Sequence, residues 1–277
     1  MRLTRNYRPA LAHACGERCV NDHNDLLVPF SLNWADSLEG VVRSIGGRVL
    51  RRADVVATDV GRPAGLVNGV VLLEPLQEAS APLQMALLDA FFAFDSGTQA
   101  GSVFMFTVWP VPDLTAYGWN CVEQMPLMVR CAEGAAPSWP PELRIAEVRS
   151  VADLHHFEEV MVEGFPVPEL HGLPPGSVFG PVLLGDDRFR FWLGWHDDQP
   201  VTAAASYISH GLVDLIFLAT LPQARGQGFG TALAWTATLA NPELPAILIA
   251  SQEGQPLYAR MGYQHLRDMP LWVRERP

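Results

Sequence analysis

The chain has 277 residues and a formal net charge of −11, with 49% hydrophobic and 18% charged residues. This length suits two domains of ordinary size, and the hydrophobic fraction is typical of globular proteins with packed cores. The negative charge argues against nucleic acid as a partner. No apolar run reaches the ~18 residues of a membrane span, and polar residues interrupt the apolar core that a signal peptide needs after Met1–Pro9. We therefore expect a cytoplasmic protein that binds neither nucleic acid nor membranes.

Closely spaced cysteines and histidines occur near the start of the chain, at His13, Cys15, Cys19 and His23. A spacing of four places Cys15, Cys19 and His23 on one face of a helix, an arrangement that could bind zinc. The alternative is that these cysteines are small buried side chains of an N-terminal helix. Because no paired Cys-x-x-Cys motif is present, we expect no metal site.

Two fourteen-residue segments of the chain resemble each other. Tyr117–Arg130 reads YGWNCVEQMPLMVR and Met261–Arg274 reads MGYQHLRDMPLWVR, 144 residues further on. Such self-similarity at a fixed offset indicates a duplicated structural unit. We therefore predict two copies of one α/β (α+β) fold, residues 1–130 and 142–277. The linker between them, residues 131–141, is rich in proline and small residues.

The second copy begins with regular elements that the sequence marks clearly. Ser150, with Asp153 three residues later, is typical of a helix N-terminus, and apolar runs separated by turn residues predict strands. In chain order we expect a strand at Leu143–Val148, a helix at Ala152–Gly164, strands at Arg188–Trp195 and Pro200–Tyr207, and a buried strand at Leu212–Thr220.

The next segment, Leu221–Gly230, reads LPQARGQGFG and lies between a buried strand and a helix. Its glycines permit backbone angles that direct consecutive N–H groups to one point, and a helix N-terminus adds favourable charge. Arg225 adds a positive charge, so the loop is suited to phosphate oxygens. The spacing does not fit a dinucleotide fingerprint, and a P-loop would need a lysine, which the chain lacks. The remaining alternative is a tight turn without a ligand.

Three further elements follow the loop. We expect a helix through Ala240, a strand at Ala246–Ala250 and a short helix around Gln255–Met261, before a final strand into Leu271–Arg274. Strands and helices that alternate in this way predict a mixed sheet flanked by helices.

The loop and the segment PLYARMGY (Pro256–Tyr263) together resemble the GNAT superfamily of acyl-CoA N-acyltransferases. Arg225, Gly228 and Gly230 match the pyrophosphate loop Arg/Gln-x-x-Gly-x-Gly/Ala, and Pro256–Tyr263 is similar to the family segment LYERLGF. The resemblance implies two GNAT-like lobes, each a mixed, mostly antiparallel sheet flanked by helices. It further implies acetyl-CoA as co-substrate, a small-molecule amine as acceptor and no metal.

The resemblance also implies roles for particular residues. Tyr258 would be the general acid toward the departing thiolate, the alternative being a merely packed aromatic. Asp214 is the first candidate for the general base, with Glu163 and His210 behind it, although ordered water serves in some members. The expected cofactor-binding residues are Leu218, Thr220, Arg225, Gly226, Gln227, Gly228, Phe229, Gly230 and Thr231.

The first copy lacks these features. Its corresponding segment, Glu78–Ala86, reads EASAPLQMA and contains no glycine, so side chains would fill the space that phosphates need. We expect a degenerate lobe that packs against the second and walls its acceptor site. Two functions remain open from sequence: an N-acetyltransferase acting on a primary amine, or a non-catalytic acyl-CoA-binding sensor or regulatory protein.

Overall fold

The computed structural model describes residues 23–65, 67–93, 101–132, 136–165 and 168–276, so His13, Cys15 and Cys19 lie outside its description. Short 3-10 helices accompany the longer elements. In chain order these longer elements are α1 (Leu27–Ser44), β1 (Arg48–Arg51), β2 (Val55–Asp59), β3 (Gly69–Leu72), α2 (Ala81–Phe92), β4 (Gly101–Phe106), β5 (Asn120–Arg130), β6 (Arg144–Glu147), α3 (Val151–Gly164), β7 (Phe189–His196), β8 (Gln199–Ser209), β9 (Leu212–Thr220), α4 (Phe229–Thr238), β10 (Ala246–Ile249), α5 (Gln255–Arg260) and β11 (Gln264–Arg276).

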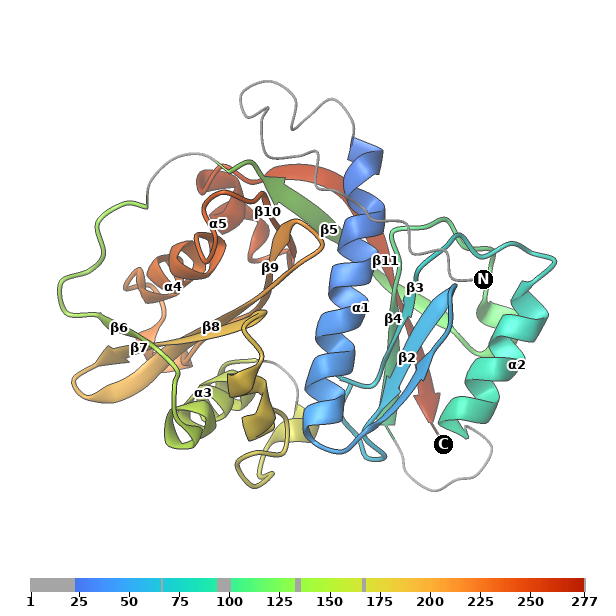
Figure 1. The fold of residues 1–277 in the computed structure, drawn as a ribbon, viewed down its shortest axis with the longest axis horizontal. Coiled ribbons are helices and arrows are strands. Elements are labelled where there is room, and N and C mark those ends of the chain that lie inside the picture. Colours follow the sequence, from blue (N-terminus) through green and yellow to red (C-terminus); the bar gives the residue numbers. More distant parts are fainter. Residues whose placement is uncertain (1–22, 66, 94–100, 133–135, 166–167, 277) are drawn as a thin grey trace.

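The strands form one 11-stranded sheet in the order β1-β2-β3-β4-β11-β5-β10-β9-β8-β7-β6. Neighbouring strands run antiparallel except in two pairs, β3 with β4 and β9 with β10. One face of the sheet packs against α1 and α3, while α2 and the pair α4 and α5 pack on the other face (Figure 1). The predicted mixed, mostly antiparallel sheet flanked by helices is confirmed. None of the described helices is long and apolar enough to cross a membrane.

The two repeated segments form neighbouring strands, and each pairs with the other half of the chain. Arg130 of β5 lies opposite Ala246 of β10, while Arg274 of β11 lies opposite Val103 of β4. The two halves therefore exchange their final strands, which joins the expected pair of sheets into one.

The register between β5 and β11 follows the repeat. Met125 lies directly opposite Met269, and these two residues are 144 positions apart. The pairing skips one residue in each strand, Val122 and Leu266, again 144 positions apart. A pseudo-two-fold axis therefore passes between the two methionines.

Helix α1 belongs to the first half by sequence but packs on both halves. It lies in the middle of the molecule and contacts β2 and β3 as well as β8 and β9 (Figure 1). Asn33 donates a hydrogen bond from Nδ2 to the carbonyl of Ser209 at 3.0 Å, and His210 Nε2 lies 2.8 Å from Asp36 Oδ2. The first half thus covers part of the second half's sheet.

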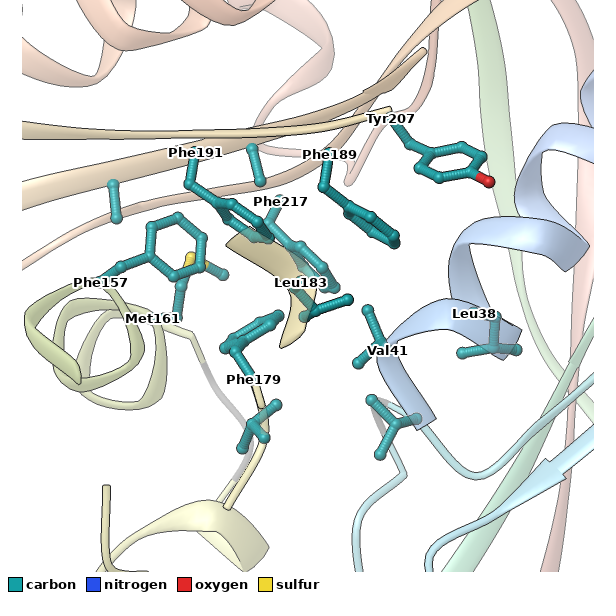
Figure 2. Close-up of a cluster of buried hydrophobic side chains, with 14 of the residues drawn as sticks. Leu38, Val41, Phe157, Met161, Phe179, Leu183, Phe189, Phe191, Tyr207 and Phe217 are labelled. Atoms are coloured by element: carbon teal, nitrogen blue, oxygen red, sulfur yellow. The ribbon is translucent and has the colours of Figure 1, made fainter. Parts of the chain in front are cut away.

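Aromatic side chains fill the space between α1, α3 and strands β7–β9 (Figure 2). The ring of Phe179 lies 5.1 Å from that of Phe157 and 5.2 Å from that of Phe217. The buried Glu158 carboxylate accepts backbone N–H bonds from residues 177–179, which fixes the segment leading to this cluster. A well-packed core therefore supports the C-terminal part of β9.

Candidate active site

Strands β9 and β10 form a V, because they pair over only two residues. Val213 lies opposite Ala246 and Asp214 opposite Ile247, after which no described strand pairs with β9 on that side. The pairing of β9 with β8 skips Ile216, which is the β-bulge that turns β9 away from β10. Meanwhile β10 continues alongside β5. On its open side β9 therefore pairs with no further strand among the described residues, and one carbonyl there, that of Thr220, accepts a hydrogen bond from Arg225 Nε at 3.1 Å.

The alternation of the strand identifies the backbone groups on this edge. Leu221 donates its N–H to Val201 on the β8 side at 2.9 Å. Because successive residues direct their backbone groups to opposite sides, those of Leu218 and Thr220 face the V. An extended ligand that carries amide groups can bind such an edge as an added strand.

The glycine loop lies at the open end of the V. Gly226 has a φ of +79° and Gly228 a φ of +83°, values that residues other than glycine rarely adopt. A Cβ at Gly226 would meet nothing within 4 Å, and one at Gly228 would meet only Pro140 Cγ at 3.5 Å. Helix α4 begins directly after Gly228, so the first N–H groups of the helix, at residues 229–231, have no partner within it. This arrangement is suited to phosphate oxygens.

Arg225 is held by backbone carbonyls on either side of the loop. Its guanidinium donates to Thr220 O and to Gly164 O, each at 3.1 Å. Gly230 allows the helix to approach the end of β9, since a Cβ there would lie 2.8 Å from Thr220 Oγ1. Arg225 and Gly230 therefore hold the loop in place, and direct contact of Arg225 with a phosphate stays a prediction.

Tyr258 lies on α5, within the core that α4 and α5 form on their face of the sheet. It is 7% exposed, and its ring lies 5.7 Å from that of Tyr263. Burial raises the pKa of Tyr258 to about 12, so the phenol keeps its proton at neutral pH. A thiol, with a reference pKa near 8.5, is the stronger acid. Tyr258 is therefore suited to donate a hydrogen bond to a departing thiolate rather than to transfer its proton fully.

Of the three predicted base candidates, Asp214 alone lies at the V. It occupies the last paired position of β9, is 1% exposed, and neither carboxylate oxygen has a hydrogen-bond partner among the described residues. Burial raises its pKa well above the ordinary value. Glu163 is exposed near the end of α3, and His210 is paired with Asp36 in the turn between β8 and β9.

The first half has the same strand arrangement without the site. The pairing of the repeated strands makes Gly69 equivalent to Asp214, so the carboxyl group is missing there. Leu72 is equivalent to Leu218, and its carbonyl accepts a hydrogen bond from Trp109 Nε1 at 3.1 Å. Sequence reasoning missed Trp109, because nothing local marks a side chain that reaches a carbonyl 37 residues away. The side chain of Trp109 therefore occupies an edge that is open in the second half.

Among the described residues, no group of three or more His, Cys, Asp or Glu side chains could hold a metal ion.

Comparison with known proteins agrees with this geometry. Residues 187–265 match the model of the acetyltransferase (GNAT) domain, whereas no curated protein matches the chain. A GCN5-related N-acetyltransferase from Kribbella flavida superposes with a TM-score of 0.65 at 20% identity, covering 90% of this chain and 95% of its own. One from Sphaerobacter thermophilus gives a TM-score of 0.56 at 15% identity, covering 92% of both chains. Residues 187–265 are therefore similar to a GNAT acetyltransferase domain, and the chain shares the fold of these two solved structures over most of its length.

Proposed function

We propose that the protein is an N-acetyltransferase that moves the acetyl group of acetyl-CoA to the primary amine of a small acceptor. The observation that carries this proposal is the V between β9 and β10, with the glycine loop and the N-terminus of α4 at its open end. An acyl-CoA has a phosphate-rich end and an amide-rich arm. The loop suits the first and the unpaired edge of β9 suits the second.

The residues around the V can divide the chemistry between them. Acetyl-CoA supplies the acetyl group as a thioester. Backbone groups of Leu218 and Thr220 hold the arm, and those of residues 225–231 hold the pyrophosphate. Asp214, on the α1 face of the sheet, accepts the proton that the amine loses as its nitrogen bonds to the acetyl carbon, a role that requires its carboxyl group to ionise when the amine is bound. Tyr258, on the opposite face, donates a hydrogen bond to the sulfur as the carbon–sulfur bond breaks.

A second candidate function is a non-catalytic acyl-CoA sensor or regulator. The observation that favours it is the complete burial of Asp214, because a general base must reach the proton that it accepts. In that case the V would bind the acyl-CoA, while the buried carboxyl group of Asp214 would take part in no reaction.

Thiol release tests the two functions directly. The protein is incubated with acetyl-CoA and with polyamines, aminoglycosides, amino acids and peptides that have a free N-terminus, and the acetylated product is identified by mass spectrometry. The Gly228→Val variant is the matched control, since its altered loop should bind acetyl-CoA poorly. Amine-dependent thiol release by the native protein supports the enzyme. Tight binding of acetyl-CoA without acetylation of any amine class supports the sensor.

A further inference from the structure

Several buried polar atoms near α1 and β9 have no hydrogen-bond partner. Both carboxylate oxygens of Asp214 and Oδ1 of Asn33 are in this condition within the described part of the chain. The two residues are 1% and 0% exposed, respectively. Because unpaired buried acceptors are costly, folded proteins rarely keep several of them together without a ligand or water.

The backbone register places these two side chains over the same part of the sheet. Asn33 Nδ2 lies 3.0 Å from Ser209 O and 3.5 Å from Tyr207 O, and Tyr207 lies opposite Asp214 in the pairing of β8 with β9. Tyr207, like Asp214, points to the face that α1 covers, because residues opposite each other share a face of the sheet. The two carbonyls engage the amide nitrogen of Asn33, which leaves its oxygen as the unpaired atom of the side chain.

The equivalent position in the first half is apolar. Gly69 stands where the second half has Asp214, and Leu38 of α1 packs there, with its Cδ2 3.0 Å from the place of a Cβ. Helix α1 therefore places a leucine over Gly69 in the first half and an asparagine over β8, the strand that pairs with β9, in the second half. The polar pair is confined to the half that has the other features of an active site.

We propose that Asn33 and Asp214 together bind the amino group of the acceptor, so that the first half supplies part of the amine site of the second. This inference rests on the proposed function and names the class of acceptor. An amine offers two or three N–H donors to the three unpaired oxygens, whereas an alcohol offers one. The site therefore selects a primary amine over the corresponding alcohol. Asp214 lies at the apex of the V, so the amine that it holds is next to the thioester.

Amine binding in the presence of CoA tests the inference on the full chain. The probes are butylamine, tyramine and spermidine, with 1-butanol as the matched alcohol, and binding is measured by calorimetry. The main variant is Asn33→Ala. The control variant is Ser37→Ala on the same helix, because within the described part of the chain the buried Ser37 hydroxyl bonds only to a carbonyl of its own helix, Trp34 O at 2.9 Å. If Asn33→Ala does not fold, Asn33→Ser takes its place.

We expect the native protein to bind at least one amine and not 1-butanol. The Asn33 variant should bind that amine about tenfold or more weakly, with a higher KM for the amine and unchanged affinity for acetyl-CoA. Equal amine affinity in the Asn33 and Ser37 variants, or binding of no amine by the native protein, would overturn the inference. If an amine is acetylated but the Asn33 variant keeps its KM, the proposed function stands and only this inference fails. If an amine binds through Asn33 but is not acetylated, the enzyme proposal fails and the inference stands.

Discussion

The substitution Asp214→Asn should make the protein more stable at neutral pH, by an amount that grows with pH. Burial raises the pKa of the Asp214 carboxyl group above its ordinary value of 3.8, and no described residue offers it a hydrogen bond. In the window between the unfolded and folded pKa values, the native state holds a proton that the unfolded chain has lost. The stabilising contribution of this group is complete below the unfolded pKa and is lost as the pH rises toward the folded one. Within the window, the free energy of unfolding falls by about 1.4 kcal/mol for each pH unit.

Urea unfolding of the native protein and of Asp214→Asn at about pH 5, 6 and 7 measures this difference. Asparagine has nearly the same shape and does not titrate, so the gap between the two free energies of unfolding should widen with pH. Asp186→Asn is the matched control. Hydrogen bonds from Arg188 lower the pKa of Asp186, so that carboxylate is ionised in both states over this range and the gap should stay constant. If the native protein and Asp214→Asn have parallel pH profiles, Asp214 is ionised in the folded protein and the reasoning is wrong.

Four more outcomes follow from the two halves and the V. Calorimetric titration should show one acetyl-CoA site per chain, because Trp109 occupies the edge in the first half; two equivalent sites would contradict this. Gly228→Val should weaken acetyl-CoA binding about tenfold or more, because valine is strained at a φ of +83°; unchanged affinity in a folded variant would mean that the loop does not hold phosphates. Tyr258→Phe should lower kcat on the order of 10²-fold with little effect on the Kd of acetyl-CoA or on stability; native turnover, with acyl transfer rate-limiting, would reduce Tyr258 to a packing role. A protease site inserted between residues 131 and 141 should, after cleavage, leave two fragments that co-elute in size-exclusion chromatography, because β5 and β11 remain paired; separate elution would refute the role of the exchanged strands.

Local elements of the second half were predictable because their signals lie close together in the sequence. Ser150 accepts a hydrogen bond from the N–H of Asp153 at 3.1 Å and begins α3, as the capping pattern predicts. The apolar run Leu212–Thr220 coincides with β9. The predicted final strand, Leu271–Arg274, is only the end of β11, which starts at Gln264. Polar residues in the first part of β11 conceal it from a search for apolar runs.

Long-range features of the site were beyond the reach of the sequence. The repeat shows that β5 and β11 are equivalent. Because equivalent strands fit either half equally well, no local feature of the sequence reveals which half each strand pairs with. The covering of Asp214 depends on α1, more than 170 residues earlier in the chain. Asn33 carries no motif, and its position is known only once α1 is placed on β8.

The exchange of strands also determines when the protein can fold during synthesis. Strand β5 finds its two neighbours, β10 and β11, only after most of the second half has been made, and β4 can pair on its second side only once β11 has been made. A nascent first half therefore exposes the open edges of β4 and β5, which are the surfaces through which strands of different molecules aggregate. Most of this pairing joins residues far apart in sequence, a topology that folds slowly. Without β11 neither half of the sheet is complete, so the 13 residues of this strand decide whether either lobe can close.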